Sequence, residues 1–575
     1  MKKISGIFIA IILFLGLSIS NFQSQSISQF IFGQNAWMPD TIGKASSCMD
    51  PPCLLNGKLH KKWADVASSG AKVVRFGGIS PDKNRPTDYQ YIKMIDSIRS
   101  RGMEPIMQVP FMNWRYTAQQ AAAIVQYVNV TKSRNVKYWI IGNEPDLGYS
   151  FTSSSQIAAY VKPFSSAMKA VDPTIKIIGP ECAWYNQGII NGLTTPNGPD
   201  DITGKDNFGR YYVDAISFHI YPFNGSQTRS QVISKLTSPG SFQDNLIALN
   251  QRINNCNSFH SRTGTDVLRT AVTEANVSWQ NSSSDGLYAN GANSFIGGQF
   301  IAEMMGIAMK QNVQFLNIWS VIEGNSLINN IGYLDPASGK RKPSFYHFQL
   351  LADHFSGNYL NGVSGNTMVK TFGCKKQNEI CVLLMNQDLA NGFNFALSLN
   401  SSLISGNYSL KLNIDANISS SCYTDYISAQ STILLRFDLY GNLLEKIVYS
   451  LDEQAVNNAP PLSYLYNITT GSEEISTPSA SGSEPFSIKN VFPIPSVDGK
   501  VSILIGKGNA SPENDFLVEV FNLSGQLIYS KKLFFRGGKE EIDIGQDAGS
   551  GMYILRIKSS QEDKFLNQKI MIIRN

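Results

Sequence analysis

Apolar and polar positions alternate regularly between about residue 30 and residue 354. Short apolar segments, which predict buried strands, are followed by longer helix-like stretches. The expected strands are 30–37, 72–77, 104–109, 137–142, 175–179, 214–219, 268–273 and 314–319, and the helical stretches between them include 88–101, 118–129, 155–170, 241–255 and 294–310. Eight buried strands in alternation with helices predict a parallel sheet, and this number favours a closed (β/α)8 TIM barrel over 26–356.

An open, doubly wound sheet is the alternative fold for the same alternation. No Gly-x-Gly-x-x-Gly turn supports it. The closed barrel is therefore the expected fold of this region.

The pattern changes after residue 355. Short strands with turn residues between them are expected at 367–371, 379–386, 394–399, 408–414 and 433–438. They predict an antiparallel β-sandwich over 357–450. The next stretch, 451–485, is rich in Ser, Pro, Asn and Gly, so a linker or a partly ordered connection is expected there.

The last segment, 486–575, is again rich in short alternating strands and predicts a second, small β-sandwich. It begins with FPIP (492–495), continues through VEVFNLSG (518–525) and ends with GMYILRI (551–557) and a last strand around KIMI (569–572). The order of these pieces resembles the C-terminal sorting domain of the type IX secretion system. The chain departs from the usual aromatic-Pro-Asn-Pro turn at Ile494. An ordinary accessory sandwich or a carbohydrate-binding module is the alternative.

The resemblance implies where the protein is transported. It implies recognition by the secretion machinery, export across a Gram-negative outer membrane, removal of the domain, and release or attachment at the cell surface. The N-terminus agrees with export, because Lys2 and Lys3 precede an apolar run to about Ile19, which is typical of a signal peptide and is assigned to 1–25. A membrane anchor is the alternative for this run. No other segment is long and apolar enough to cross a membrane, so no span is expected in the mature protein.

Composition narrows the range of functions. The chain has 575 residues and a formal net charge of only +5, and no basic run is long enough to follow a phosphate backbone. Nucleic acid is therefore not an expected partner. Seven cysteines are present, none with the spacing of a zinc site. Export permits disulfides, and Cys48 with Cys53 or Cys374 with Cys381 are close enough in sequence to close small loops.

Two of the expected strands end on a glutamate. Glu144 follows the fourth strand in YWIIGNEP (138–145), and Glu274 follows the seventh in RTAVTEAN (269–276). Carboxyl ends of barrel strands meet at one mouth, where catalytic groups lie. Hydrolysis of a glycosidic bond with retention needs two carboxyl groups. If the two lie about 5–5.5 Å apart, no water fits between carboxylate and sugar, and a covalent glycosyl-enzyme is expected.

At these residues the sequence resembles clan A of the retaining glycoside hydrolases, which carry Asn-Glu-Pro after strand four and Glu after strand seven. The resemblance implies that Glu144 is the acid/base and Glu274 the nucleophile, and that Asn143 binds the sugar 2-hydroxyl. Further supporting residues are expected at other strand ends: Arg75 after strand two, His219 and Tyr221 after strand six, and Trp319 after strand eight as an aromatic floor for the sugar. No metal and no organic cofactor are expected.

Several alternatives remain open at this point. Four other carboxylates compete for the catalytic roles: Asp146, Glu181, Glu323 and Asp335. Further sugar-binding positions are expected from Trp37, Trp114, Trp184 and Trp279. The expected function is that of a secreted retaining glycoside hydrolase acting on a polysaccharide or oligosaccharide. A glycan-binding surface protein without activity and a retaining transglycosylase are the alternatives.

Overall fold

The computed structural model describes two units, Met1–Ile468 and Thr469–Asn575. Its described residues are 25–36, 62–323, 326–401, 408–414, 423–439 and 441–466 in the first unit and, in the second, 487–492, 500–506, 515–522, 526–534, 539–544, 548–549, 551–559 and 565–572. The expected signal peptide, apart from Gln25, and also Trp37, Cys48 and Cys53 lie outside these residues.

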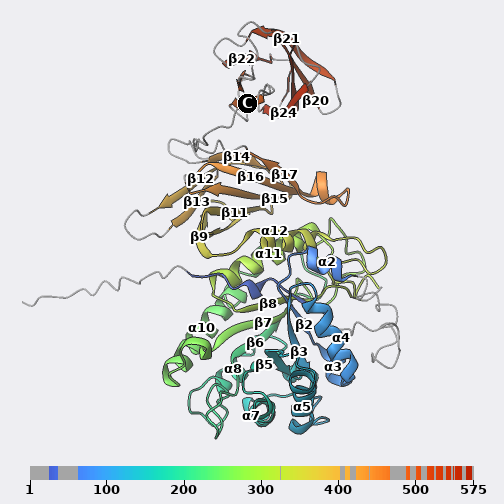
Figure 1. The fold of residues 1–575 in the computed structure, drawn as a ribbon, viewed down its shortest axis with the longest axis vertical. Helices are drawn as coiled ribbons and strands as arrows, with labels where there is room; N and C mark the ends of the chain where they lie inside the picture. Colours follow the sequence, from blue (N-terminus) through green and yellow to red (C-terminus); the bar gives the residue numbers. More distant parts are fainter. Residues whose placement is uncertain are drawn as a thin grey trace, which may run out of the picture. The chain divides into compact units, whose positions relative to one another are not determined.

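Eight parallel strands close into a barrel (Figure 1). They are β1 (Gly33–Asn35), β2 (Val73–Phe76), β3 (Glu104–Val109), β4 (Tyr138–Ile141), β5 (Lys176–Cys182), β6 (Ala215–Ile220), β7 (Arg269–Ala275) and β8 (Phe315–Ile318). Strand β8 pairs with β1 through Gly33 and Asn317, which completes the ring. The predicted TIM barrel is confirmed, and the open sheet is excluded. The first strand is shorter than expected because residues Gln29–Ile31 form a helical turn before it.

Helices alternate with the barrel strands along the chain. They are α2 (Trp63–Ser68), α3 (Ile79–Lys83), α4 (Asp88–Arg99), α5 (Ala118–Val125, extended by a wider turn over Gln126–Thr131), α6 (Pro145–Gly148), α7 (Ser154–Val171), α8 (Gln187–Leu193), α9 (Arg229–Lys235), α10 (Phe242–Phe259), α11 (Phe295–Lys310) and α12 (Pro343–His354). Helices α4, α5, α7 and α9 each begin with a Ser or Thr cap and a Gln three residues later, which together satisfy the free N–H groups of the first turn.

Side chains inside the barrel change from apolar to polar along the strands. Successive residues of a strand point to opposite faces. The first inward positions form one apolar cluster: Val73, Ile106, Ile140, Ile178, Ala215, Ala271 and Phe315. Two residues further along five of these strands, the buried side chains are polar: Arg75, Gln108, Ser217, Thr273 and Asn317. The interior is therefore closed by apolar packing at one end and carries its polar groups toward the carboxyl ends of the strands.

A nine-stranded sheet follows the barrel in the order β14-β12-β13-β9-β10-β11-β15-β16-β17. Its strands are β9 (Asn358–Ser364), β10 (Val369–Lys375), β11 (Glu379–Asn386), β12 (Phe393–Ser401), β13 (Tyr408–Ile414), β14 (Tyr423–Ile427), β15 (Ser431–Asp438), β16 (Leu443–Ser450) and β17 (Leu462–Leu465). The two halves of the sheet enclose one apolar cluster, in which Phe395 and Leu397 of β12 pack with Val382 and Leu384 of β11. The sandwich is antiparallel as predicted, except that β13 and β9 are parallel.

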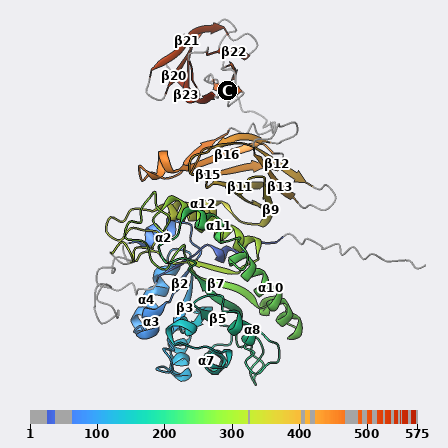
Figure 2. The ribbon, with the colours of Figure 1, turned by 180° about the vertical axis from the view of Figure 1, so that it is seen from behind.

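The barrel and this sheet share a core. Figures 1 and 2 show α11 and α12 between the barrel strands and the sheet. On β11, residues Leu383 and Met385 pack into the same cluster as these helices, whereas Val382 and Leu384 face the interior of the sandwich. Strand β11 is buried on both faces, which explains its continuous apolar sequence.

The sequence predicts a linker or a partly ordered connection over 451–485, and the first part of this stretch is ordered. Residues Leu451–Ala455 form a helical turn, and β17 pairs with β16. The side chains of Leu451 and Ala455 are buried and anchor this turn, although most of their neighbours in the sequence are polar. The rest of the expected linker lies outside the described residues, except for Tyr466.

The C-terminal unit is a small sandwich of two sheets, as predicted. One has the order β18-β19-β22 and the other β21-β20-β23-β24. The strands are β18 (Ser487–Phe492), β19 (Lys500–Gly506), β20 (Asp515–Asn522), β21 (Leu527–Phe534), β22 (Lys539–Asp543), β23 (Gly551–Ser559) and β24 (Phe565–Ile572). Val501 and Ile503 of the first sheet pack with Val518, Leu555 and Ile557 of the second.

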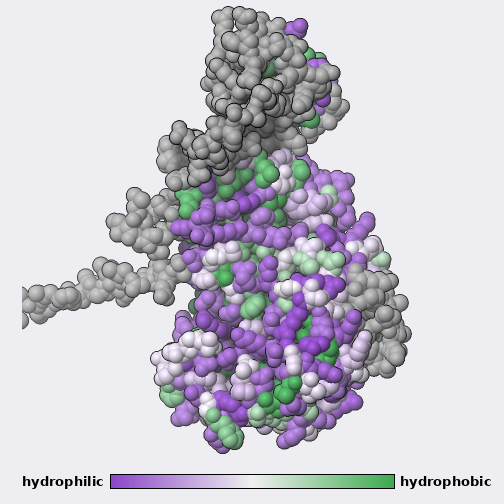
Figure 3. Space-filling model, in the orientation of Figure 1, coloured by the Kyte–Doolittle hydropathy of each residue, from purple (hydrophilic) through white to green (hydrophobic). Residues whose placement is uncertain are grey.

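The described cysteines are free thiols: Cys182, Cys256, Cys374 and Cys381. Cys374 and Cys381 lie directly opposite each other on β10 and β11, so the loop closure expected for them is a pair of facing, buried thiols. On the face shown in Figure 3, the described surface is mostly hydrophilic, with apolar residues in small groups. None of the described helices is long and apolar enough to span a membrane.

The shared core between barrel and sheet makes a testable prediction. A Cβ added at Gly306 of α11 would overlap the ring of Phe372 on β10. Gly306→Ala is expected to lower the free energy of unfolding by about 1–3 kcal/mol, because close-packed cores tolerate added volume poorly. Gly188→Ala in α8 is the matched control, since its Cβ would meet only Asn186 at 3.8 Å. Chemical denaturation measures both, and equal stabilities of the two variants would contradict a tight barrel–sheet contact.

Candidate active site

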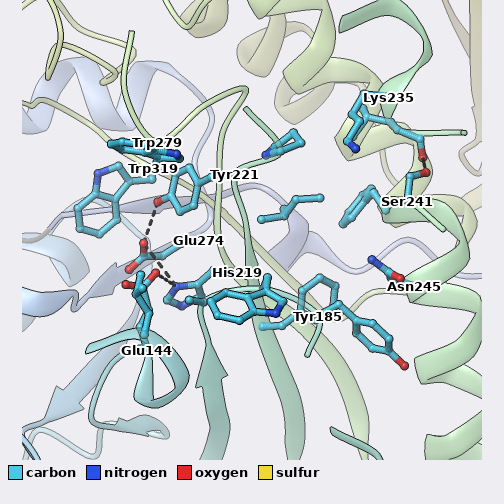
Figure 4. A pocket seen from close by; sticks show the side chains of 18 of the residues that line it. Glu144, Tyr185, His219, Tyr221, Lys235, Ser241, Asn245, Glu274, Trp279 and Trp319 are labelled. Atoms are coloured by element: carbon cyan, nitrogen blue, oxygen red, sulfur yellow. Dashed lines mark hydrogen bonds and ion pairs between the residues drawn. The ribbon is translucent and has the colours of Figure 1, made fainter. Parts of the chain in front are cut away.

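The carboxyl ends of five barrel strands bring their polar side chains together at one mouth. Arg75 ends β2, Glu144 follows β4, Glu181 lies in β5, His219 in β6 and Glu274 in β7. Figure 4 shows Glu144, His219 and Glu274 grouped at one side of a pocket. Residues that are as much as 199 positions apart in the sequence are therefore in direct contact.

The Arg75 guanidinium connects the site. Its Nη1 donates to Oε1 of Glu274 at 2.8 Å and to Oδ1 of Asn35 at 2.9 Å. Its Nη2 donates to Oε2 of Glu181 at 2.8 Å and to Oδ1 of Asn143 at 2.9 Å. The side chain is fully buried, and these four acceptors replace the hydration of Nη1 and Nη2. One cation thereby fixes the positions of two carboxylates and two amides.

This arrangement also orients the Asn143 amide. A guanidinium has only donors, so the carbonyl oxygen of Asn143 must face Arg75 and the amide Nδ2 points elsewhere. Asn143 lines the pocket. Its NH2 group is therefore available to donate to a hydroxyl of a bound molecule.

Glu274 accepts a second strong hydrogen bond from the other side. Tyr221 Oη donates to Oε2 of Glu274 at 2.7 Å. Burial raises the pKa of Glu274, and the positive charges of His219 and Arg75 oppose this shift. Because each oxygen of Glu274 has a donor, the orientation of the carboxylate is fixed.

His219 lies between three carboxylates. Its Nδ1 is 2.9 Å from Oε1 of Glu144 and 3.6 Å from Oε2 of Glu274, and its Nε2 is 3.5 Å from Oε2 of Glu181. Burial alone would lower the pKa of His219, but the charge of Glu274 and the hydrogen bonds to Glu144 and Glu181 raise it to about 10. At neutral pH the ring is therefore an imidazolium, with both nitrogens as donors.

Glu144 is the more accessible of the two mouth carboxylates. Its side chain is 18% exposed, against 6% for Glu274. The backbone of Glu144 has a φ of 48°, in the left-handed region, and its N–H donates to the carbonyl of Glu181 at 3.0 Å. Such strain is stored where the surrounding structure enforces it, and here it turns the carboxylate toward the pocket.

Glu181 contacts both Arg75 and His219, although the sequence suggests it only as a competing catalytic carboxylate. It is fully buried, and besides Arg75 and His219 it accepts a hydrogen bond from Thr273 Oγ1 at 2.7 Å. Burial would raise its pKa, but the charges of Arg75 and His219 lower it to about 2. Glu181 is therefore a permanent anion that balances the two cations from below. The signal for this role was its position at the end of the fifth strand.

The remaining competing carboxylates are held by local contacts. Asp146 accepts from the N–H of Ala183 at 2.8 Å, and Glu323 accepts from Ser320 Oγ at 2.7 Å. Asp335 closes its own turn by accepting from the N–H of Ser338. These interactions hold the loops around the barrel mouth.

The pocket has a volume of about 740 Å³ and is lined by many aromatic side chains. Trp184, Tyr185, Trp279 and Trp319 are among them. The carbonyl oxygen of Trp319 accepts a hydrogen bond from Asn276 Nδ2, two residues beyond Glu274. Trp114 is not among the lining residues; it packs edge-on against Phe111 at 5.1 Å.

Glu144, His219 and Glu274 also place three atoms of the kinds that bind metals within 4.8 Å of one another. A metal would need the neutral imidazole as ligand, whereas the pKa of His219 is raised to about 10. Arg75 adds a second positive charge at 2.8 Å from Glu274. The donor set therefore fits a proton network better than a cation site.

The charges around His219 make a second prediction. The imidazole resonance of His219 in NMR spectra, assigned with His219→Gln, is expected to titrate near pH 10. Because this pKa lies above the ordinary 6.5, the stabilisation by the imidazolium is complete below about pH 6.5 and is lost as the pH rises toward 10. Glu181→Gln removes one of the three carboxylates and should lower the titration midpoint. The exposed Glu453→Gln is the control, and an unshifted midpoint in Glu181→Gln would contradict the network.

Several solved structures and one family of sequences are similar to parts of the chain. Among solved structures, the chain is similar to CelM2, a bifunctional glucanase-xylanase from a metagenome library, with 13% identity, coverage of 72% of this chain and 97% of that chain, and a TM-score of 0.48. A monomeric beta-xylosidase from Caulobacter crescentus CB15 has 13% identity, the same two coverages and a TM-score of 0.46. A glycoside hydrolase family 44 xyloglucanase from Paenibacillus polymyxa has 13% identity, again the same coverages and a TM-score of 0.44.

At 13% identity, the activities of these proteins are not carried over to this chain. No curated protein sequence matches the chain. Residues 490–573 match the family described as the secretion system C-terminal sorting domain, which confirms the resemblance found in the last segment.

Proposed function

We propose that the protein is a retaining glycoside hydrolase in which Glu144 is the acid/base and Glu274 the nucleophile. The observation that carries this proposal is the carboxylate separation. One oxygen of Glu144 and one of Glu274 lie within 4.8 Å of each other at the barrel mouth. Retaining enzymes need about 5–5.5 Å between the carboxyl groups, and inverting enzymes need about 6.5–9.5 Å to admit a water.

The charge balance supports the assignment of roles. Arg75 and His219 carry two positive charges, and Glu181 and Glu274 carry two negative charges. The cluster is neutral when Glu144 holds a proton. Glu144 is also the more exposed carboxylate, as a proton donor to a leaving group must be, whereas Glu274 is held by Arg75 and Tyr221.

The reaction proceeds in two steps on these residues. In the first, an oxygen of Glu274 forms a bond to the anomeric carbon, the glycosidic C–O bond breaks, and the proton of Glu144 goes to the leaving oxygen. In the second, ionised Glu144 takes a proton from water, the water oxygen bonds to the anomeric carbon, and the ester to Glu274 breaks. His219 donates to Glu144 from Nδ1 and stabilises its negative charge between the steps.

The surrounding residues position the sugar. The free NH2 group of Asn143 is placed to donate to the 2-hydroxyl, a contact that strengthens in the transition state. Trp319 offers an aromatic face for the ring at the reacting position. A poly- or oligosaccharide is the proposed substrate, since the pocket is larger than one ring requires and has further aromatic walls.

The matched sorting domain supports a place of action outside the cell. We propose that the chain is exported by the type IX machinery after removal of the signal peptide, and that the barrel then works in the medium or at the cell surface. This location suits an enzyme for glycans too large to enter the cell.

Two substitutions test the catalytic pair. Glu144→Gln is expected to lower kcat by about 10²- to 10⁴-fold, the contribution of acid–base catalysis, and Glu274→Gln by at least as much because the covalent route is lost. Reducing-end release from a panel of plant, algal and host polysaccharides measures this, with Glu453→Gln as the control. Near-normal turnover in either pocket variant would exclude its assigned role.

The product's stereochemistry separates the remaining possibilities. Proton NMR early in the reaction is expected to show the anomer of the substrate's own configuration. The opposite anomer would refute the double displacement. Binding without release would favour a glycan-binding surface protein, and longer products would favour a transglycosylase.

A further inference from the structure

The far wall of the pocket carries a cation with no role in the chemistry proposed above. Lys235 is the last residue of α9, and Ser241 and Asn245 lie at the start of α10. All three line the same 740 Å³ pocket as Glu144 and Glu274. Figure 4 shows them across the pocket from these two carboxylates.

The ammonium of Lys235 is unpaired among the described residues. No hydrogen bond and no ion pair of its Nζ is found there, although the side chain is partly buried. The nearby carboxylate of Asp244 instead accepts from the N–H of Gly240 at 2.9 Å. Several other partly buried lysines have acidic partners, such as Lys176 with Asp214 at 3.0 Å.

Two neighbours favour the same kind of ligand. The side-chain amide of Asn245 also makes no hydrogen bond to a described residue, so its NH2 group is free to donate. The hydroxyl of Ser241 donates to the carbonyl of Leu236 at 2.9 Å instead of capping α10. The first N–H groups of this 18-residue helix lie at the same wall, together with the carboxylate of Asp244, which accepts from the N–H of Gly240.

Among the described residues, the opposite end of the pocket offers no such free cation. Arg75 and His219 lie there, but both are paired with Glu181 and Glu274, so neither is left to bind an anionic group close to the reacting carbon. An anionic substituent is favoured only on a ring that lies away from the reacting carbon. Trp184, Tyr185 and Trp279 also line the pocket, and their rings suit the faces of further sugar rings.

We propose that Lys235 and Asn245 bind an anionic substituent, a carboxylate or a sulfate ester, on a glycan whose reacting ring lies at Glu274. The proposal rests on the proposed glycosidase function for the position of the reacting ring. It gives the substrate class as acidic polysaccharides, with the charged group held at the end of the pocket remote from the bond that is cleaved.

Matched pairs of polysaccharides test this binding site without depending on cleavage. Each pair contains an acidic polymer and its neutralised form: glucuronoxylan and its carboxyl-reduced form, pectin with free and with methyl-esterified carboxyls, and a carrageenan with and without its sulfate esters. Affinity electrophoresis measures binding by the full chain carrying Glu274→Gln, which prevents turnover. Tighter binding of the acidic member of at least one pair is expected, by about fivefold to tenfold and weaker at high salt.

Substitution of Lys235 locates the effect. Lys235→Ala in the same background is expected to abolish the preference for the acidic member, and Lys235→Arg to retain it. Lys93→Ala, at an exposed lysine of α4, changes the net charge equally and is expected to change nothing. No preference in any pair, or a preference that survives Lys235→Ala, would overturn the proposal. The carboxylate pairs and the sulfate pair show which anion is bound.

Reducing-end release by the unsubstituted chain from the same polymers keeps the two proposals separate. A Lys235-dependent preference in binding without any release would support the anion site and refute the glycosidase. Release that is equal for acidic and neutralised polymers, with equal binding, would support the glycosidase and refute the anion site.

Discussion

A buried guanidinium is the interaction on which the candidate active site depends. Arg75 is cut off from water and must have its charge balanced inside the barrel, at a large cost if any partner is missing. Its partners come from β1, β5 and β7 and from the turn after β4, so their side chains can satisfy it only when the barrel has closed in the observed register. Gly77 is part of this constraint, because a Cβ there would lie 2.8 Å from the guanidinium carbon. The residues at the mouth can therefore reach this arrangement only in the closed barrel.

Much of this was predictable from the sequence. The strands that end at Glu144 and Glu274 are continuous apolar runs bounded by turn residues, and in a parallel barrel such strands deliver their last side chains to one mouth. The positions of Arg75, His219 and Tyr221 follow from the same rule, and the structure brings all five residues together. The catalytic roles of these residues remain predictions, because geometry shows proximity and charge but not turnover.

Other features were beyond the sequence for physical reasons. The role of Glu181 depends on how deeply its side chain is buried in the barrel. A fully buried carboxylate balances the charge of its neighbours and does not contact substrate, and the pattern of apolar residues in the sequence does not give the depth of burial. Lys235 is not part of a recognisable sequence motif. It is singled out only because its ammonium has no partner among the described residues. The end of the sandwich was misjudged because Leu451 and Ala455 are isolated among polar residues, and burial there is decided by the sheet that they pack against.

The two-faced burial of β11 has a consequence for how the chain can be divided. A fragment that stops after α12, where the barrel pattern ends, would expose the apolar faces of α11 and α12 that Leu383, Met385 and Tyr449 now cover. An exposed apolar surface of this kind favours aggregation of the isolated barrel. A piece that contains the mouth residues and keeps this core covered thus extends through the sandwich to Ala455, the last residue of the shared cluster. Recombination that exchanges the sandwich for another module must carry a matching apolar surface with it, so the two layers are expected to be inherited together.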